Sequence, residues 1–539
     1  RARRIRYKRV VKKVLLTLLA AVLSTAAFPQ EIAKGHVYVD SNGNGKKDRG
    51  EKGVPQVAIS NGSRITLTDK DGYYELPVAP DNIIFAIKPS GYAFPADDNN
   101  MPRFYYIHKP GGSPANYKFK GVEPTGKLPR RIDFALNVSD EPEKFRALIF
   151  GDQQVRGPEM LGFYDRKIVS ELAGVGNVAF GISMGDVSDE DLDLMGSIKE
   201  VTARIGIPWY YVNGNHDTNY EADHDIMGNE TFIRHLGPPN YSFNYANAHI
   251  LVLDNILYPD PRNTKKKSVW GGFREDQLEF IGNDLALVDK DRLVVVMAHI
   301  PFIDNWVRTE DLRFLYDKLK KFNNVLLVAA HTHTQQHVFH GSSAGWDKPQ
   351  PLHLYIAGTA CGSWYSGFLD EDGIPEATMT DGTPQGYAFL NIDGNRYTLE
   401  YKVAGKPAGY QMSISHPKIV IKDKHTPSFI TVNYFMGYKT DKVEFRVDGG
   451  PWKAMDHTVM PDPAYQNMYY RWEQSEEVHV NRWPSAPANS SHLWRTRIPV
   501  RGLEAGKHRI EVRATNLFGD TAYGESEYMV AEPVNNFYP

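Results

Sequence analysis

Apolar runs of strand length recur between residues 145 and 405, and several of them end in a cluster of polar residues. The runs lie at 147–150, 178–182, 209–212, 250–253, 293–297, 325–329 and 352–356. Continuous apolar strands are typical of sheets that are buried on both faces. Helical patterns over 191–204, 274–288 and 310–320 separate some of the runs. We therefore expect an α/β domain over 145–405, in which helices flank a largely inner sheet.

Two regions with short strand patterns flank this domain. Residues 31–140 include the hairpin signal Asn61-Gly62. Residues 409–539 include a strand pattern at 442–447 before Asp448-Gly449, and another at 507–512. Short strands at close spacing are typical of small β-sandwiches. The predicted fold class is thus multidomain α/β + β: a central α/β sandwich flanked by two small β-sandwich domains.

Residues 1–30 have the pattern of an export signal. They hold eight Lys and Arg side chains and no acidic one, followed by an apolar run over 14–23 and by small residues. Spanning a bilayer takes about 20 apolar residues, and neither this run nor any later one is long enough. We therefore expect 1–30 to be a signal peptide and the protein to be periplasmic or secreted, without stable membrane insertion.

Charge and cysteine content exclude several classes of function. The formal charge of the whole chain is −3, but outside residues 1–30 there are 54 basic and 65 acidic side chains, a charge of −11. Binding to nucleic acid needs basic patches that neutralise phosphates, so we expect no nucleic-acid partner. The single cysteine excludes intramolecular disulfides, four-cysteine zinc sites and iron–sulfur clusters.

The polar clusters after the strands consist of metal-ligand residue types. They are Gly151-Asp152-Gln153-Gln154, Gly185-Asp186-Val187-Ser188-Asp189, Gly214-Asn215-His216-Asp217, Ala298-His299 and Ala330-His331-Thr332-His333. In an open α/β sheet, sites lie beyond the carboxyl ends of the strands. Asp, Asn and His side chains suit Mn, Fe and Zn. Both histidines of an alternating His-x-His should point to one face and reach neighbouring metals. The sequence therefore predicts a dinuclear metal site.

This series resembles the motifs of the calcineurin-like metallophosphoesterases, which run Asp-x-His, Gly-Asp-x-x-Asp, Gly-Asn-His-Asp/Glu, His and Gly-His-x-His. The match covers about 145–405, and the whole layout is similar to a bacterial three-domain group of that family. The resemblance implies two metal ions, one on Asp152, Gln154, Asp186 and His333, the other on Asp186, Asn215, His299 and His331. It also implies that a hydroxide held between the metals attacks phosphorus in line. His216 would assist the leaving oxygen and Asp217 would orient its ring.

The first motif departs from the family pattern. Gln154 stands where the family usually has His, and Ala330 replaces a Gly. An amide oxygen coordinates a hard cation more weakly than imidazole does, which favours Mn²⁺ or Mg²⁺ over Fe³⁺ at this position. Alternatively, Gln154 only forms hydrogen bonds around the ligands. The cofactor prediction is therefore two divalent or trivalent ions, of Mn, Fe or Zn.

Two aromatic residues near the clusters are candidates for substrate contact. Trp364 follows the strand pattern at 352–356 and could stack on a substrate group. Tyr220 follows the third cluster and could line the cleft. The alternative roles are packing for Trp364 and a solvated loop for Tyr220.

A second cation motif lies in the first domain. Residues 40–51 fit the spacing of an EF-hand loop, with oxygen side chains at positions 1, 3, 5, 9 and 12 and Gly at position 6. A strand pattern at 37–39 precedes the loop, so it is not an EF-hand; it resembles the loop of bacterial Cna-B-like or SdrD-B-like modules. The predicted structural calcium ligands are Asp40, Asn42, Asn44, Lys46, Asp48 and Glu51. An Asn/Gly-rich turn is the alternative.

Taken together, these patterns predict an exported dinuclear-metal phosphoric ester hydrolase. Its substrate would be a phosphorylated small molecule or a phosphodiester, and the motifs do not separate the monoester from the diester. Gln154 and the two flanking β-domains also suggest an alternative, a catalytically impaired surface or periplasmic binding protein on a phosphoesterase scaffold.

Overall fold

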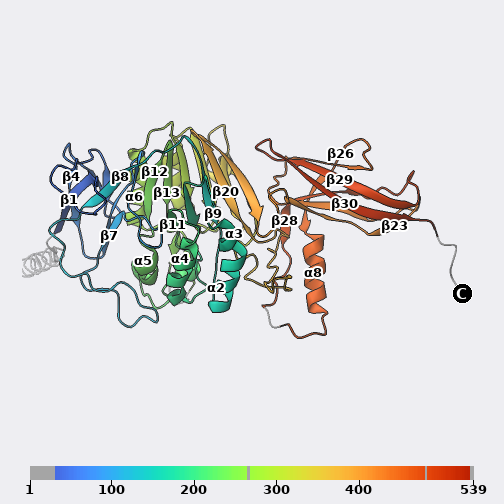
Figure 1. The fold of residues 1–539 in the computed structure, drawn as a ribbon, viewed down its shortest axis with the longest axis horizontal. Coiled ribbons are helices and arrows are strands. Elements are labelled where there is room, and N and C mark those ends of the chain that lie inside the picture. The colour runs from blue at the N-terminus through green and yellow to red at the C-terminus, as the bar shows by residue number, and fades with distance from the viewer. Residues whose placement is uncertain (1–30, 264–267, 480–481, 534–539) are drawn as a thin grey trace, which may run out of the picture.

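The structure is a computed structural model, and it describes residues 31–263, 268–479 and 482–533. The signal-peptide prediction concerns residues 1–30 and lies outside them. Figure 1 shows three parts in chain order along the long axis, with the first strands at one end and the last strands at the other. The central part holds the predicted metal ligands and is in contact with both neighbours.

The first part is built from two four-stranded sheets. Their orders are β4-β1-β8-β6 and β3-β2-β5-β7. Asn61-Gly62 lies in the turn of the β2–β3 hairpin, where Ser60 pairs with Ile65, as the sequence predicts. The strands are β1 (Glu31–Val39), β2 (Ala58–Ser60), β3 (Ile65–Leu67), β4 (Tyr73–Val78), β5 (Asn82–Ala86), β6 (Tyr92–Ala93), β7 (Tyr105–His108) and β8 (Phe134–Val138).

The central part contains two larger sheets instead of one inner sheet. The five-stranded sheet has the order β11-β10-β9-β20-β21, and the six-stranded sheet has the order β12-β13-β16-β17-β19-β18. A short pair, β14 (Ile256–Leu257) and β15 (Trp270–Gly271), lies beside them. The main strands are β9 (Lys144–Phe150), β10 (Phe180–Ser183), β11 (Trp209–Tyr211), β12 (Tyr241–Tyr245), β13 (Ala248–Val252), β16 (Leu293–Met297), β17 (Asn324–Ala329), β18 (Gln336–His340), β19 (Leu352–Ile356), β20 (Gly386–Asp393) and β21 (Arg396–Val403).

Helices cover the outer faces of these two sheets. On β9, Ala147 and Ile149 join the core between the sheets, whereas Leu148 and Phe150 join a second core under the helices. Both faces of the strand are therefore buried, which explains its unbroken apolar run. The helices are α2 (Pro158–Tyr164), α3 (Ser170–Leu172), α4 (Met195–Ala203), α5 (Glu230–Leu236), α6 (Glu275–Ala286) and α7 (Thr309–Leu319), with a π-helical turn at Asp165–Val169 and 3₁₀ turns at Leu192–Leu194, Asn215–Asp217, Asp225–Met227 and Ser342–Ala344.

The last part is a second pair of sheets with one helix. The orders are β22-β24-β28-β27 and β23-β30-β29-β25-β26. The elements are β22 (Met412–Ser415), β23 (Ile419–Ile421), β24 (Phe429–Tyr434), β25 (Lys442–Val447), β26 (Lys453–Ala454), β27 (Asp456–Pro461), α8 (Pro463–Glu473), β28 (Asn489–Arg497), β29 (Gly506–Thr515) and β30 (Thr521–Ala531). The sequence pattern of residues 409–539 predicts only strands. Helix α8 begins at Pro463, after Asp462 accepts a capping bond from the Tyr465 N–H at 2.8 Å.

Helix α8 and the loop after it lie against the central domain. Phe368 of the central domain packs on Trp472 of α8, with ring centroids 5.1 Å apart. The Gly367 N–H donates to the Arg482 carbonyl at 3.2 Å. The fold is thus the predicted central α/β sandwich with two β domains, and the third domain touches the loop that follows β19.

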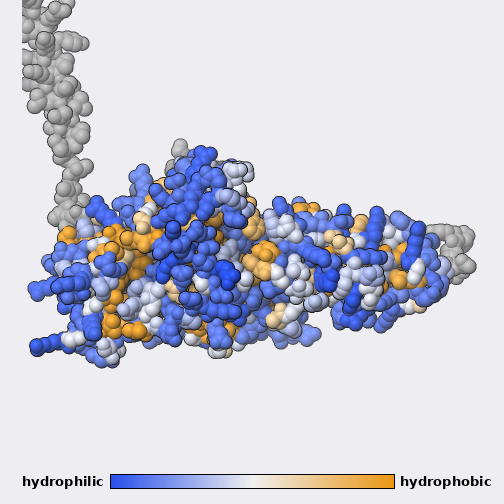
Figure 2. All heavy atoms as spheres, turned by 90° about the horizontal axis from the view of Figure 1, so that it is seen from above, coloured by the Kyte–Doolittle hydropathy of each residue, from blue (hydrophilic) through white to orange (hydrophobic). Residues whose placement is uncertain are grey.

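The surface view of Figure 2 is mostly hydrophilic, with hydrophobic residues in smaller patches. In the described part of the chain, every helix is too short or too polar to span a bilayer.

Candidate metal centre

The predicted ligands come from the carboxyl ends of five strands in the two central sheets. Strands β9, β10 and β11 are neighbours in one sheet and lead into Asp152 and Gln154, Asp186, and Asn215 respectively. Strands β16 and β17 are neighbours in the other sheet and lead into His299 and into the His331–His333 segment. Within each sheet these neighbouring strands are parallel, so their carboxyl ends lie at the same edge.

Four of the predicted ligand positions have a left-handed backbone. The φ angles are +43° at Gln154, +48° at Asp186, +71° at His331 and +49° at His333. Such angles are costly for residues other than Gly and tend to occur at functional sites. They also correct the sequence argument for His-x-His. The two histidines follow the end of β17 in a tight turn, and strand alternation does not set their directions.

Glycines next to the ligands make room for this arrangement. A Cβ on Gly214 would lie 2.0 Å from the Asp186 nitrogen, and a Cβ on Gly185 would lie 2.5 Å from His299 Nδ1. Neither position accepts a side chain without displacing a predicted ligand. The Gly-Asp and Gly-Asn pairs of the motifs therefore have a steric reason.

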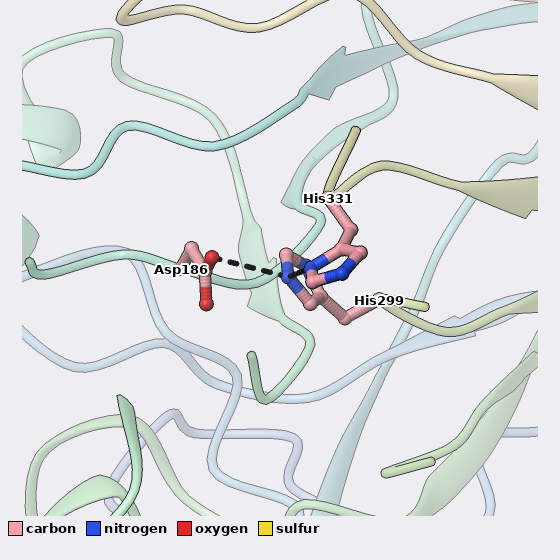
Figure 3. A group of neighbouring side chains, drawn as sticks. All are labelled: Asp186, His299 and His331. Carbon is pink, nitrogen blue, oxygen red and sulfur yellow. Dashed lines mark hydrogen bonds and ion pairs between the residues drawn. The ribbon is translucent and has the colours of Figure 1, made fainter. Parts of the chain in front are cut away.

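Asp186, His299 and His331 form a compact group of ligand atoms (Figure 3). His299 Nε2 lies 3.2 Å from Asp186 Oδ2 and 3.1 Å from His331 Nδ1. Asn215 Oδ1 lies 3.2 Å from His299 Nε2. His299 Nδ1 donates to the Met184 carbonyl at 2.8 Å, which leaves Nε2 as the coordinating atom. Among the described residues, this is the group of carboxylate and imidazole atoms that converges within 4.8 Å.

A second set lies next to it around Asp152. His333 Nε2 lies 3.2 Å from Asp152 Oδ2, while His333 Nδ1 donates to the Gly362 carbonyl at 2.7 Å. Asp152 Oδ1 accepts the His331 N–H at 3.1 Å, which connects the two sets. Gln154 is buried beside them, and its Nε2 has no hydrogen-bond partner. Its Oε1 lies 4.0 Å from Cys361 Sγ.

The electrostatics of the site favour positive charge between these groups. Burial opposes charge on His299, but the Asp186 carboxylate outweighs it and raises the pKa of His299 to about 9. Burial also opposes charge on Asp186, yet the His299 ring holds the pKa of this carboxyl below its usual range. Burial and the charge on His299 lower the pKa of His331 to about 4. Asp186 thus attracts a cation at a position where His331 is neutral and able to coordinate one.

His216 and Asp217 do not form the pair that the resemblance implies. Asp217 is fully buried and accepts the N–H groups of Val187, Ser188 and Gly214 at 3.0–3.1 Å. Burial raises the pKa of Asp217 to about 7. His216 Nδ1 instead lies 3.3 Å from Asp189 Oδ1. Asp189 thus lies closest to the His216 ring, and Asp217 bonds to the backbone of the turn; a catalytic role for His216 and Asp217 stays a prediction.

Asp189 is absent from the sequence-predicted site, although it belongs to the Gly-Asp-x-x-Asp motif. Two arginines accompany it. Arg156 Nε lies 2.9 Å and Arg482 Nη1 lies 3.5 Å from Asp189 Oδ2. The spacing of the motif could have indicated Asp189, but no local pattern marks either arginine.

Trp364 and Tyr220, the two candidates for substrate contact, lie near the site, and each already contacts a predicted ligand. Trp364 stacks on His333 with ring centroids 3.9 Å apart, and the Arg482 guanidinium lies 5.2 Å from the centroid of the Trp364 ring. The Tyr220 hydroxyl donates to the Asn215 carbonyl at 2.9 Å. Both residues therefore support predicted ligands, and stacking on a substrate stays a prediction.

The loop at residues 40–51 is organised around Asp40. Its carboxylate accepts the N–H groups of Gly43 and Gly45 at 2.8 Å. Glu51 accepts the Ser41 N–H at 2.8 Å, and Asp48 accepts from the side-chain amides of Asn42 and Asn44 at 2.8 and 2.7 Å. These bonds also describe a self-supporting turn, so calcium at this loop, with Lys46 as a further ligand, stays a prediction.

Comparison with protein families identifies the whole arrangement. The sequence model described as calcineurin-like phosphoesterase matches residues 146–335, which carry all the predicted metal ligands of the dinuclear site. The chain belongs to the calcineurin-like phosphoesterases. The models for the N terminal and the C terminal of calcineurin-like phosphoesterase match residues 41–124 and 355–522. This phosphoesterase therefore has the three-domain arrangement of its family, and it is a metal-dependent hydrolase of phosphate esters.

Solved structures similar to this phosphoesterase match it at low identity. They include the purple acid phosphatase PPD1 from yellow lupin (Lupinus luteus) seeds, at 13% identity over 65% of this chain and 67% of that one, with a TM-score of 0.34. TT1561 of Thermus thermophilus matches at 12% over 48% and 99%, with a TM-score of 0.28. Vps29 of Chaetomium thermophilum matches at 10% over 71% and 98%, with a TM-score of 0.20. Among curated proteins, none gives a significant match.

The residues present fit the divalent metal ions that the family implies. Asp152 Oδ2 is buried without a hydrogen-bond partner and lies 3.2 Å from His333 Nε2, so this side of the site places a carboxylate oxygen beside an imidazole nitrogen. The neighbouring group around Asp186 offers a carboxylate and two imidazoles within 4.8 Å. Such a mixture of oxygen and nitrogen donors suits Mn, Fe and Zn.

Proposed function

We propose that this phosphoesterase is an exported dinuclear-metal hydrolase of small phosphoric esters. The observation that carries the proposal is the pair of adjacent donor sets, one around Asp152 and one around Asp186. His331 belongs to both, since its N–H bonds to Asp152 and its ring lies beside His299. Two cations held this close would clamp the attacking and leaving oxygens of one phosphoryl group.

The protein residues around the metals hold and move protons. When bound, the metals supply Lewis acidity and lower the pKa of coordinated water. His299 and His333 each donate from Nδ1 to a backbone carbonyl, which turns the opposite nitrogen, Nε2, toward the metal site. The side chain of His216 is 25% exposed. Asp189 Oδ1 and Glu190 Oε1 lie 3.3 and 3.5 Å from His216 Nδ1. These carboxylates favour a protonated ring, which would give a proton to the leaving oxygen.

Hydrolysis of p-nitrophenyl phosphate and bis-p-nitrophenyl phosphate with added Mn²⁺ tests the activity. We expect metal-dependent turnover of at least one of them. Protein that holds metal but turns over neither would favour the impaired binding protein, and a screen of phosphorylated small molecules would then test for a more selective enzyme. Elemental analysis of purified protein tests the metal number. Two ions per chain support the dinuclear site, and one ion in a fully active protein contradicts it.

Export is proposed from the sequence of residues 1–30 alone. A fusion of these residues to a reporter that is active only outside the cytoplasm measures it. We expect reporter activity from the native segment, and a loss of activity when Leu15, Leu16, Leu18 and Leu19 are replaced by Asp. Equal activity of the two fusions would contradict export by this segment.

A further inference from the structure

The C-terminal domain reaches the metal centre through one short stretch of chain. Arg482 lies between α8 and β28, and its main chain forms an isolated bridge with Ser366 of the central domain. The Arg482 carbonyl accepts the Gly367 N–H. Near this bridge, Phe368 packs on Trp472, and Arg471 lies over the Phe368 ring. The position of Arg482 is therefore fixed by contacts on both sides of the domain boundary.

The Arg482 side chain approaches Asp189 and Trp364, two residues that neighbour the site. Its Nη1 is 3.5 Å from Asp189 Oδ2, on the side of His216. Its guanidinium carbon is 5.2 Å from the centroid of Trp364, which stacks on His333. The Arg482 guanidinium thus contacts Asp189, which lies beside the proposed proton donor His216. It also contacts Trp364, which stacks on the predicted metal ligand His333.

Arg156 approaches the same carboxylate from the central domain. Its Nε lies 2.9 Å from Asp189 Oδ2, and its side chain is 56% exposed against 37% for Arg482. Asp189 is buried and neutralises one of the two guanidinium charges. Glu190 is the other nearby carboxylate; it is exposed and lies 3.5 Å from His216 Nδ1. Each arginine therefore keeps N–H groups that are not used by Asp189.

We infer that Arg482 of the C-terminal domain and Arg156 of the central domain form a guanidinium clamp that selects phosphate monoesters over diesters. The inference rests on the proposed function, since it assigns the substrate class of the same site. Guanidinium groups bind phosphate oxygens through paired N–H donors. A monoester dianion has three non-bridging oxygens and one more negative charge than a diester, so it gains more from the clamp.

The ratio of kcat/KM for p-nitrophenyl phosphate to that for bis-p-nitrophenyl phosphate measures this selection. In Arg482→Ala and in Arg156→Ala we expect the ratio to fall at least 10-fold, because the monoester loses more of its binding to the clamp than the diester does. Arg482→Lys keeps the charge but loses the paired donors. Its ratio of kcat/KM values should lie between those of wild type and Arg482→Ala. Arg509→Ala is the matched control, because Arg509 is an exposed arginine of the C-terminal domain that pairs with Glu525 on β30.

Binding gives a readout that does not depend on turnover. Calorimetry on metal-loaded protein compares inorganic phosphate with dimethyl phosphate, a diester monoanion. We expect Arg482→Ala to raise the dissociation constant of phosphate at least 10-fold and to change that of dimethyl phosphate by less than 3-fold. Thermal unfolding of each variant identifies any that fail to fold, and Arg156→Ala serves as the second variant.

The outcomes separate the clamp from the proposed function. Equal losses for monoester and diester in a folded variant would show that the arginines only support the site, and this would overturn the clamp. A wild-type protein that prefers the diester would overturn it as well. Absence of turnover on both substrates in metal-loaded wild type would count against the proposed function. Calorimetry with phosphate would still test whether Arg482 and Arg156 form the clamp.

Discussion

Asp189 Oδ1 lies 3.3 Å from Nδ1 of His216, so the second aspartate of Gly-Asp-x-x-Asp is the buried carboxylate that faces this histidine. The carboxylate of Asp217 points elsewhere and holds three backbone N–H groups. The two aspartates therefore have different surroundings, one beside the His216 ring and one in the backbone of the turn.

Asp189→Asn should reduce catalysis more than stability. An amide in place of the carboxylate can present its N–H to His216 and favour the wrong tautomer. We expect kcat to fall about 100-fold, within the range for general acid–base catalysis, and the pH profile of kcat to lose its basic limb. Stopped assays on p-nitrophenyl phosphate across pH check this. An unchanged pH profile would show that His216 does not act as an acid through Asp189.

Asp217→Asn should reduce stability more than catalysis. The amide keeps one acceptor oxygen for N–H groups that the carboxylate satisfies with two, and its NH₂ faces the backbone donors around Val187 and Gly214. We expect a loss of about 1–3 kcal/mol in the free energy of unfolding. Urea denaturation of wild type and variant measures it. A stable variant with a 100-fold lower kcat would instead support the sequence-based role of Asp217.

Gly214→Ala should remove metal binding. The new Cβ would lie 2.0 Å from the Asp186 nitrogen and 2.3 Å from its Oδ1, so the predicted bridging carboxylate must move. We expect a loss of at least half of the bound metal in elemental analysis. Gly176→Ala is the matched control, since a Cβ there meets nothing within 4 Å. Equal metal content in the two variants would contradict the steric argument.

Gln154→His should strengthen metal binding on the Asp152 side. The Gln154 side chain is buried with an unpartnered Nε2, and imidazole is a stronger donor than an amide oxygen. We expect about a 10-fold lower dissociation constant for the more weakly held ion, on the scale of ligand effects at metal sites. Titration of metal-free protein with Mn²⁺ measures it. Unchanged affinity would indicate that Gln154 is not a ligand.

Acidic pH should lower the free energy of unfolding because of two buried histidines, His337 on β18 and His353 on β19. His337 Nδ1 lies 2.9 Å from His353 Nε2, and burial lowers the pKa of His353 to about 3 and that of His337 well below its usual value. Both are neutral in the folded and unfolded chain above a pH of about 6.5. Between about pH 6.5 and 3 the unfolded chain binds protons that the folded chain does not, so stability falls as the pH falls.

The measurement is urea denaturation at pH 7 and pH 5. Each such histidine contributes up to about 1.4 kcal/mol per pH unit in this window. His353→Gln removes one titrating group and should show a smaller loss between the two pH values than wild type. An equal loss in both proteins would contradict the assignment.

The strands and the ligand types were predictable because both are local in sequence. Each apolar run of β9, β10, β16 and β17 carries its own burial signal, and the ligands follow directly. What the sequence does not determine is direction. Left-handed backbone at Asp186, His331 and His333 sets where the side chains point, and no strand pattern encodes such angles.

Contacts between distant segments were not predictable. Arg482 and Trp364 are far apart in the chain, and only the docking of α8 on the loop after β19 brings them together. Helix α8 has a local start signal in Asp462-Pro463, which the prediction of strands alone for residues 409–539 leaves out. The different surroundings of Asp189 and Asp217 depend on the turn at residues 214–217, where the Gly214 N–H donates to the Asp217 carboxylate.

The order of the residues along the chain has a consequence for synthesis. All predicted ligands of the dinuclear site lie between residues 152 and 333, whereas Arg482 comes much later. At about 10 residues per second, Arg482 leaves the ribosome roughly 15 s after His333. The chain therefore carries all the predicted metal donors well before Arg482 is made, so the inferred substrate contact of the C-terminal domain is the last part of the site to be synthesised.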